Sequence, residues 1–265
     1  MTQRPARVDR SGRVVVTAMR CGSILTVSIL LLIIGFVLSE AWPALIGIGP
    51  RFLTDESWHP TEGTFGAGPM LVGSLLTTAG AVAIAVPLGV LTAVYWTYHA
   101  PSWVAPPLRI CVELLAGVPS VVFGLWGLVV IVPWILEIRP PGQCLLAASI
   151  VLASMIVPTI TLLTEQALRE LPRHLAANAA ALGLCQRTTI WRILVPQARR
   201  SIGVAALLAT ARALGETMAV LLVCGNAVAY PSSPFDSIRT LTTGIALEMA
   251  YALGEHRAAL FACGF

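Results

Sequence analysis

Long apolar runs constrain this chain more than any other feature of its sequence. A helix needs about 20 apolar residues to cross a hydrocarbon core about 30 Å thick. Runs of that length lie at about 21–41, 69–97, 107–134, 143–164 and 201–223. Only 11% of the 265 residues are charged, against about 25% in soluble domains. The sequence therefore predicts an all-α polytopic membrane protein.

Two shorter apolar stretches follow the fifth run. Residues 241–253 contain Glu248, so we expect a short interfacial or re-entrant piece there. Residues 258–265 read like the first turns of another spanning helix. At about 1.5 Å per residue they would reach only a fraction of the way across a bilayer. We therefore expect five full spanning helices and a truncated sixth.

The placement of arginine predicts how the chain is oriented. All 17 basic residues are arginines. Five lie in residues 1–20 and six in 165–200, whereas the segment 42–68 sets one arginine against three carboxylates. Because arginine is enriched in cytoplasmic loops, we expect a cytoplasmic N-terminus (1–20), then a first spanning helix and external loop (21–68). A core (69–265) with a cytoplasmic loop at about 166–200 follows. The first run is too long for a cleavable signal peptide, and no small-residue cleavage site follows it.

Signatures of enzymes and metal sites are missing from the sequence. A phosphate-binding P-loop needs a lysine, and this chain has none. Neither a GxSxG elbow nor an HExxH helix occurs, which argues against an intramembrane hydrolase. The six cysteines form no CxxC pair, and the four histidines are isolated in or beside expected loops. We expect no metal, no cofactor and no catalytic residues.

The segment 175–196, "LAANAAALGLCQRTTIWRILVP", predicts a helix, a turn and a second helix. Residues 175–182 are rich in alanine, which favours a helix, and Gly183 permits a sharp turn. The stretch "TTIWRIL" before Pro196 predicts a short amphipathic helix. By these arguments alone the segment is either an ordinary surface helix pair or a docking site for a partner.

This segment resembles the EAA loop of bacterial ABC-importer permeases, in which small residues precede a glycine and an Ile and Pro follow it. Three further stretches resemble the PstC type of phosphate-importer permease: "GSLLTTAGAVAIAVPLGVLTAVY" (73–95), "VELLAGVPSVVFGLWG" (112–127) and "RALGETMAV" (212–220). The resemblance implies an importer-permease (MetI-like) helical bundle in the bacterial inner membrane. It further implies a permease that does not itself hydrolyse ATP.

In that family the EAA loop docks on the cytoplasmic ATPase. The resemblance assigns this role to Ala177, Asn178, Ala179, Gly183, Ile190, Ile193, Leu194 and Pro196. Two positions depart from the family pattern, since Ala177 stands where glutamate is usual and Asn178 where alanine is usual. The acidic docking contact is therefore expected to be missing.

Charged residues and prolines inside the apolar runs are the candidates for a transport pathway. Arg212 and Glu216 are four residues apart, so on a helix they would share a face and could pair. The pair could fix helix packing, or Arg212 could bind a passing anion while Glu216 limits its affinity. Pro119 would break a helical hydrogen bond and serve either a pathway or packing. Glu113 is either a snorkelled carboxylate or a functional one.

The resemblance implies half of a channel for inorganic phosphate. The implied partners are a second homologous permease, a cytoplasmic ATPase dimer and a periplasmic phosphate-binding protein, with no nucleic acid. Two alternatives stay open. One is a permease for another oxyanion, sulfate or molybdate, and the other is a truncated remnant that assembles without transporting.

The predicted orientation can be tested with thiol reagents that do not cross membranes. In a background without the native cysteines, a cysteine at His59 should react from outside the cell. A cysteine at Arg187 should react only when the cytoplasmic face is opened, because the arginine count places it inside. The reverse pattern would contradict the orientation.

Overall fold

The computed structural model describes the backbone of residues 10–265 and the side chains of 15–172 and 174–265. Residues 1–9, with Arg4 and Arg7 of the expected cytoplasmic N-terminus, lie outside the described residues. Most of the described chain is helical, which confirms the predicted all-α class. Four of its helical stretches are long and apolar enough to cross a membrane: Val15–Gly47, Gly68–Tyr98, Ser120–Ile138 and Leu145–Arg169.

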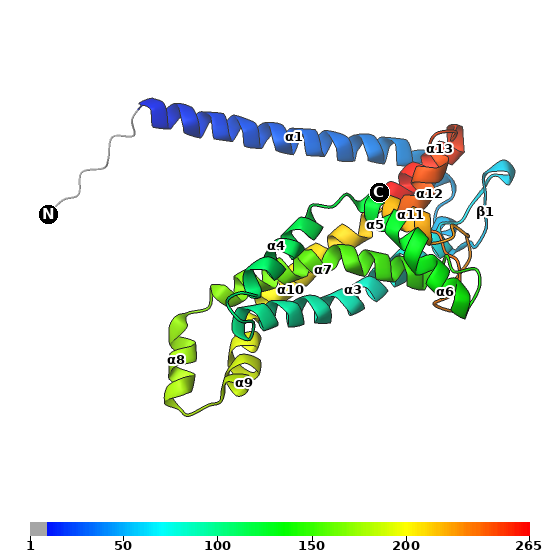
Figure 1. Ribbon diagram of the computed structural model, residues 1–265. Coiled ribbons are helices and arrows are strands. Elements are labelled where there is room, and N and C mark those ends of the chain that lie inside the picture. The colour runs from blue at the N-terminus through cyan, green and yellow to red at the C-terminus, as the bar shows by residue number, and fades with distance from the viewer. Residues whose placement is uncertain (1–9) are drawn as a thin grey trace.

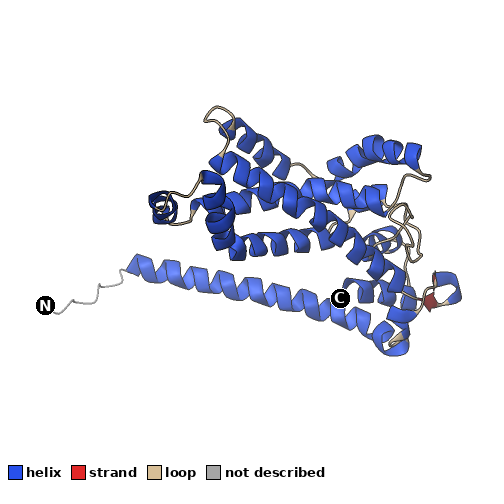
Figure 2. Ribbon diagram, turned by 90° about the horizontal axis from the view of Figure 1, so that it is seen from below, coloured by secondary structure: helices blue, strands red, loops and turns tan. Residues whose placement is uncertain are grey.

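Helix α1 (Arg10–Gly47) runs apart from the rest of the molecule for most of its length (Figures 1 and 2). Its apolar side chains are exposed; Leu32, for example, is 71% accessible. It meets the rest of the chain near its end, where the Phe36 ring lies 5.8 Å from that of Phe261 on α13 (Gly254–Gly264). A surface this apolar is stable only against lipid or another protein.

The centre of the bundle is the contact between α3 (Gly68–Tyr98) and α7 (Leu145–Arg169). Small residues of α3 allow it: Ala81, Ala85 and Ala93 are fully buried on one face, the first two one turn apart and the third two turns further on. The backbones approach so closely that a Cβ added at Gly89 would lie 2.8 Å from Ile160 Cγ2. Both helices continue through an internal proline, Pro87 in α3 and Pro158 in α7.

The third apolar run is two helices, so the expectation of one helix over 107–134 is wrong. Helix α4 (Ala105–Ala116) ends before Pro119, whose ψ of 141° is extended, and α5 (Ser120–Trp126) begins after it. A proline lacks an N–H and biases the preceding residue away from the α region, which explains the break. The run then continues through a π-helical turn, Gly127–Ile131, into α6 (Val132–Ile138).

The fifth run is also broken, contrary to the expectation of one spanning helix over 201–223. Helix α10 (Val195–Leu214) ends at Gly215, and α11 (Met218–Val223) starts three residues later. The weaker stretch at 241–253 contains a short helix, α12 (Leu241–Glu248). The largest buried cluster joins α3, α5, α6, α7, α10 and α11.

The two ends of the bundle carry different structures (Figure 1). At one, here called the loop end, lie α8 (Arg173–Ala181) and α9 (Gln186–Thr189), followed by a π-helical turn, Ile190–Leu194. At the other, the hairpin end, lie α2 (Arg51–Thr54), a single turn of 3₁₀ helix (Pro60–Glu62), and the paired strands β1 (Trp58–His59) and β2 (Thr64–Phe65).

The close approach of α3 and α7 generates a stability prediction. Gly89→Ala should lower the melting temperature of the purified protein in detergent by several degrees, because overpacking costs about 1–3 kcal/mol and exceeds the gain in helix propensity. Gly203→Ala in α10 is the matched control, because nothing lies within 4 Å of a Cβ added there. A Gly89→Ala protein as stable as the control would contradict this packing.

Candidate functional site

The break between α10 and α11 determines where Arg212 and Glu216 lie. Arg212 is in the last turn of α10, but the chain leaves the helix after Leu214, so Glu216 is not one helical turn further along the same face. The predicted ion pair is therefore wrong. Glu216 Oε1 instead accepts a hydrogen bond of 3.2 Å from the backbone N–H of Ala219 at the start of α11. The carboxylate thus supplies an acceptor to a helix N-terminus.

Arg212 is exposed, and no hydrogen bond or ion pair joins it to another described residue. The face of α10 that packs against the bundle is formed by alanines, among them Ala205 and Ala209. Leu207 and Leu208 of the same helix are 71% and 54% accessible. Placing an arginine side chain in the hydrocarbon core of a bilayer costs several kcal/mol unless the side chain contacts a polar partner or water. This face of α10 is therefore suited to a second subunit or a polar pathway.

A small polar cavity of about 10 Å³ lies beside the break. Its lining includes Ser74, Thr77 and Thr78 of α3, together with Glu216 and Thr242. Such a volume holds about one water molecule. The Thr242 hydroxyl donates a hydrogen bond of 2.9 Å to the Glu216 carbonyl oxygen. These residues were not predicted from the sequence, because nothing local distinguishes them from other serines and threonines of membrane helices.

The other two pathway candidates lie around the break between α4 and α5. Glu113 is half-exposed and pairs with Arg109 at 2.8 Å. Arg109 also lies 3.5 Å from Glu165 of α7, a buried carboxylate that forms an ion pair of 2.7 Å with Arg169. Glu113 thus belongs to a charged network between α4 and α7, and the sequence analysis missed its buried member.

Pro119 lies between α4 and α5, next to an open apolar groove of about 400 Å³. The groove is lined by Leu115, Val118, Val122, Phe123, Trp126 and Ser154. Pro119 therefore lies beside an apolar surface, and neither this groove nor the polar cavity beside Glu216 brings it together with Arg212.

The loop end has the predicted helix-turn-helix shape. Gly183 adopts a φ of +73°, the left-handed region that favours glycine, between α8 and α9. Ala177 and Asn178 are exposed on α8, whereas Ala179 is 2% accessible. Pro196 does not end the second helix; it occupies the first turn of α10, where its missing N–H is not needed.

The apolar side chains of this loop divide into two sets. Ile190 and Leu194 are 1% and 5% accessible and pack with Val94 of α3 and Leu168 of α7. The expectation that Ile190 and Leu194 contact the ATPase is therefore corrected, because both side chains pack the loop against helices of the same chain. Leu182, Leu184 and Trp191 are the exposed ones, at 78%, 38% and 42%.

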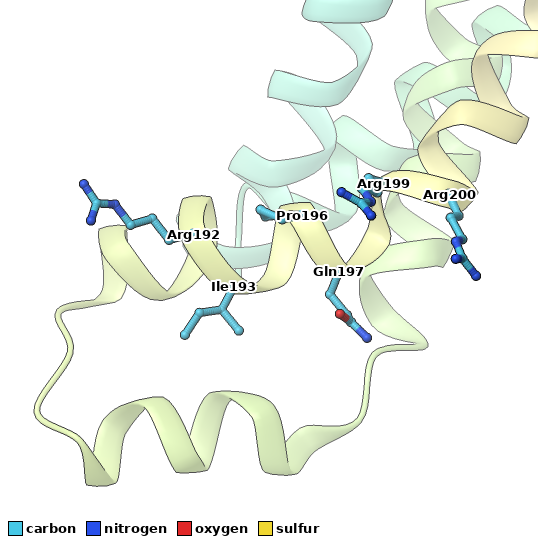
Figure 3. Close-up of a pocket in the computed structure, with 6 residues that line it drawn as sticks. All are labelled: Arg192, Ile193, Pro196, Gln197, Arg199 and Arg200. Atoms are coloured by element: carbon cyan, nitrogen blue, oxygen red, sulfur yellow. The ribbon is translucent and has the colours of Figure 1, made fainter.

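Ile193, which is partly buried, lies between Arg192 and Gln197 (Figure 3). An open groove of about 570 Å³ is lined by Arg192, Ile193, Pro196, Gln197, Arg199 and Arg200. Figure 3 shows Arg192 pointing away from Arg199 and Arg200, so the three guanidinium groups do not converge on one point. The groove is a broad basic surface at the loop end.

At the hairpin end, Glu248 is the centre of a polar cluster that the sequence analysis did not find. Its carboxylate accepts hydrogen bonds from Trp58 Nε1 at 2.8 Å and from Arg239 at 2.6 Å, and His256 Nε2 lies 2.9 Å away. Burial alone would raise the pKa of Glu248. The hydrogen bonds from Trp58 and His256 and the charge of Arg239 outweigh burial, so the pKa lies below its ordinary value.

The helical bundle, with its amphipathic loop at one end, has the fold of an importer's membrane subunit. The chain belongs to the family described as "Binding-protein-dependent transport system inner membrane component", whose model matches residues 85–263. It is therefore a multi-pass inner-membrane permease subunit of an ABC importer. It is not an enzyme, since ATP is hydrolysed by a separate subunit of such importers.

Individual relatives confirm the resemblance to PstC-type permeases. The chain is 40% identical over 242 residues to "Probable ABC transporter permease protein YqgH" of Bacillus subtilis, covering 89% of this chain and 78% of that protein. It is 37% identical over 229 residues to "Phosphate transport system permease protein PstC" of Mesorhizobium japonicum, covering 78% and 70%. A chain of the MetNI methionine ABC transporter in an inward-facing conformation shares the fold, with a TM-score of 0.53 at 20% identity over 73% of this chain and 84% of that one.

The exposed position of Ala177 generates a prediction about docking. Ala177→Glu should raise co-purification with the ATPase subunit, because it restores the carboxylate that is usual at this position. The rise should be only about severalfold, because an exposed ion pair contributes little binding free energy. Ala176→Glu, one residue away and also exposed, is the matched control for added charge. Equal co-purification of both variants and the unchanged chain would show that the missing carboxylate does not limit docking.

Proposed function

We propose that this chain forms half of a membrane pathway for inorganic phosphate, paired with a second homologous permease. A cytoplasmic ATPase dimer drives it and an extracytoplasmic phosphate-binding protein delivers the anion. Several relatives at 31–37% identity are named phosphate transport system permease protein PstC, which supports phosphate as the cargo. The observation in this chain that carries the proposal is that Arg212 is exposed and has no ion-pair partner among the described residues.

Arg212 offers a positive charge that no described residue neutralises. Glu216 does not compete for it, because its carboxylate is engaged with the N–H of Ala219. A guanidinium group presents several donors that match the oxygens of a tetrahedral oxyanion. The exposed face of α10 would border the pathway, and Glu216, four residues on in sequence, would limit how tightly the anion is held.

In this proposal the loop end faces the cytoplasm and the hairpin end faces outwards. Residues 1–20 form a cytoplasmic terminus, 21–68 the first span with its external loop, and 69–265 the permease core. The ATPase docks on the loop at about 166–200, and the exposed Leu182, Leu184 and Trp191 supply its apolar contacts. Ala177, Asn178 and Gly183 lie on the same exposed part of the loop.

Sulfate or molybdate is the second candidate cargo, because a guanidinium group attracts any tetrahedral oxyanion. The name of the YqgH relative specifies no substrate. Competition separates the candidates: excess sulfate or molybdate should leave the uptake of labelled phosphate unchanged, and inhibition by either anion would favour the broader specificity.

Substitutions of Arg212 test its role in transport. Arg212→Gln should assemble normally, because it breaks no ion pair in the described chain, yet reduce phosphate uptake about 10-fold or more, as expected for losing a charged hydrogen bond. Arg212→Lys should keep part of the uptake. The double change of Arg212 and Glu216 to glutamine should also assemble and lose uptake, because it supplies no positive charge.

Arg20→Gln is the control, since Arg20 is an exposed arginine of α1, outside the proposed pathway. Both uptake and the amount of assembled complex should be measured. Normal uptake by an assembled Arg212→Gln complex would reject the role of Arg212.

A further inference from the structure

Four segments meet at Glu248: three of them lie within residues 239–256, and the fourth is 190 positions away in sequence. Trp58 comes from β1, Arg239 from the segment before α12, Glu248 from the end of α12 and His256 from α13. Glu248 itself is 6% accessible. The His256 ring stacks on Phe65 of β2 with centroids 5.9 Å apart. A buried carboxylate with three donors has one arrangement that satisfies all of them, so the cluster fixes the relative positions of these segments.

Arg239 extends the cluster towards α11. Its Nε donates a hydrogen bond of 3.1 Å to the carbonyl oxygen of Asn226, just beyond the end of that helix. One residue earlier, the backbone N–H of Ile238 donates to the carbonyl oxygen of Cys224 at 2.9 Å. The far end of α11 is therefore tied to the segment that carries Arg239.

The opposite end of α12 touches the break between α10 and α11. Thr242, in its first turn, donates to the carbonyl oxygen of Glu216 at 2.9 Å. The N–H of Leu241 donates to the hydroxyl of Ser74 on α3, also at 2.9 Å. Thr240 caps the helix through reciprocal hydrogen bonds with Thr243. Helix α12 thus spans about 12 Å from the Glu248 cluster to the break beside Arg212.

We propose that Glu248 is a positioning residue for transport: acting through α12, it holds the α10–α11 break in the place that sets Glu216 beside the pathway. This inference rests on the proposed function, because it deepens the account of the same pathway. Glu248 does not touch the anion. It keeps α12 in register with the hairpin, and α12 in turn holds the Glu216 backbone through Thr242.

A local chemical readout separates positioning from a general loss of stability. In a background without native cysteines, a cysteine at Thr217 lies inside the break, where the native residue is half-buried. If Glu248 positions the break, Glu248→Gln should raise the reaction rate of this cysteine with a water-soluble thiol reagent about severalfold. A cysteine at Leu207, further back on α10, should react at an unchanged rate.

Uptake per assembled complex gives the second readout. In the native-cysteine chain, Glu248→Gln should lower phosphate uptake about 10-fold, as expected for a lost charged hydrogen bond. Thr242→Val should lower it about severalfold. Because both variants release the same helix, the double variant should transport no more slowly than Glu248→Gln alone. Glu255→Gln is the control, since Glu255 is an exposed neighbour in α13 with no hydrogen bond or ion pair to the described chain.

Several results would overturn the inference. One is an unchanged reaction rate at Thr217 together with uptake equal to that of the Glu255→Gln control. Another is a double variant whose loss equals the product of the two single losses. If Glu248→Gln fails to assemble, Trp58→Phe removes only one donor from the cluster and should give the same two effects at smaller size. If the complex with the unmodified chain assembles but takes up no phosphate, the proposed function is contradicted. The reaction rates of the cysteine at Thr217 would still test the positioning role of Glu248.

Discussion

The backbone's need for hydrogen bonds in an apolar solvent is the constraint on which this structure depends. In hydrocarbon no water replaces a missing partner, so a chain must stay helical or bury its breaks within protein or beside a polar space. Helices α3 and α7 stay continuous despite an internal proline. At the break after Leu214, side chains replace the lost helical partners: the Glu216 carboxylate accepts from Ala219, and the Thr242 hydroxyl donates to the Glu216 carbonyl oxygen.

Hydropathy and local residue preferences predicted the continuous helices and the loop at one end of the bundle. The apolar runs located α1, α3 and α7, and the alanines, Gly183 and "TTIWRIL" located the helix-turn-helix at the loop end. Hydropathy does not show where a run leaves the helix. The residues beside Pro119 are as apolar as their neighbours, and the charges of Arg212 and Glu216 beside Gly215 fit a continuous helix as well as a broken one. The i, i+4 argument for Arg212 and Glu216 assumed a continuous helix and failed with it.

Contacts between residues that are far apart in the chain could not be predicted from local sequence patterns. Trp58 and Glu248 are 190 positions apart, and no local pattern connects them. Ile190 and Leu194 look like an exposed apolar stripe in sequence, yet they pack against Val94 and Leu168 of the same chain. The exposed face of α10 is the converse case: its leucines and Arg212 lack partners within the described chain, so the proposed pathway needs a second subunit to complete it.

The central claim is that this chain supplies half of a phosphate pathway, and transport in cells tests it most directly. The unmodified chain would be expressed, together with its partner subunits, in a bacterium that lacks its own phosphate permease of this family. Uptake of labelled phosphate would be measured alongside the amount of assembled complex in the membrane. The account predicts restored, ATP-dependent phosphate uptake. Stable assembly without phosphate uptake would contradict it.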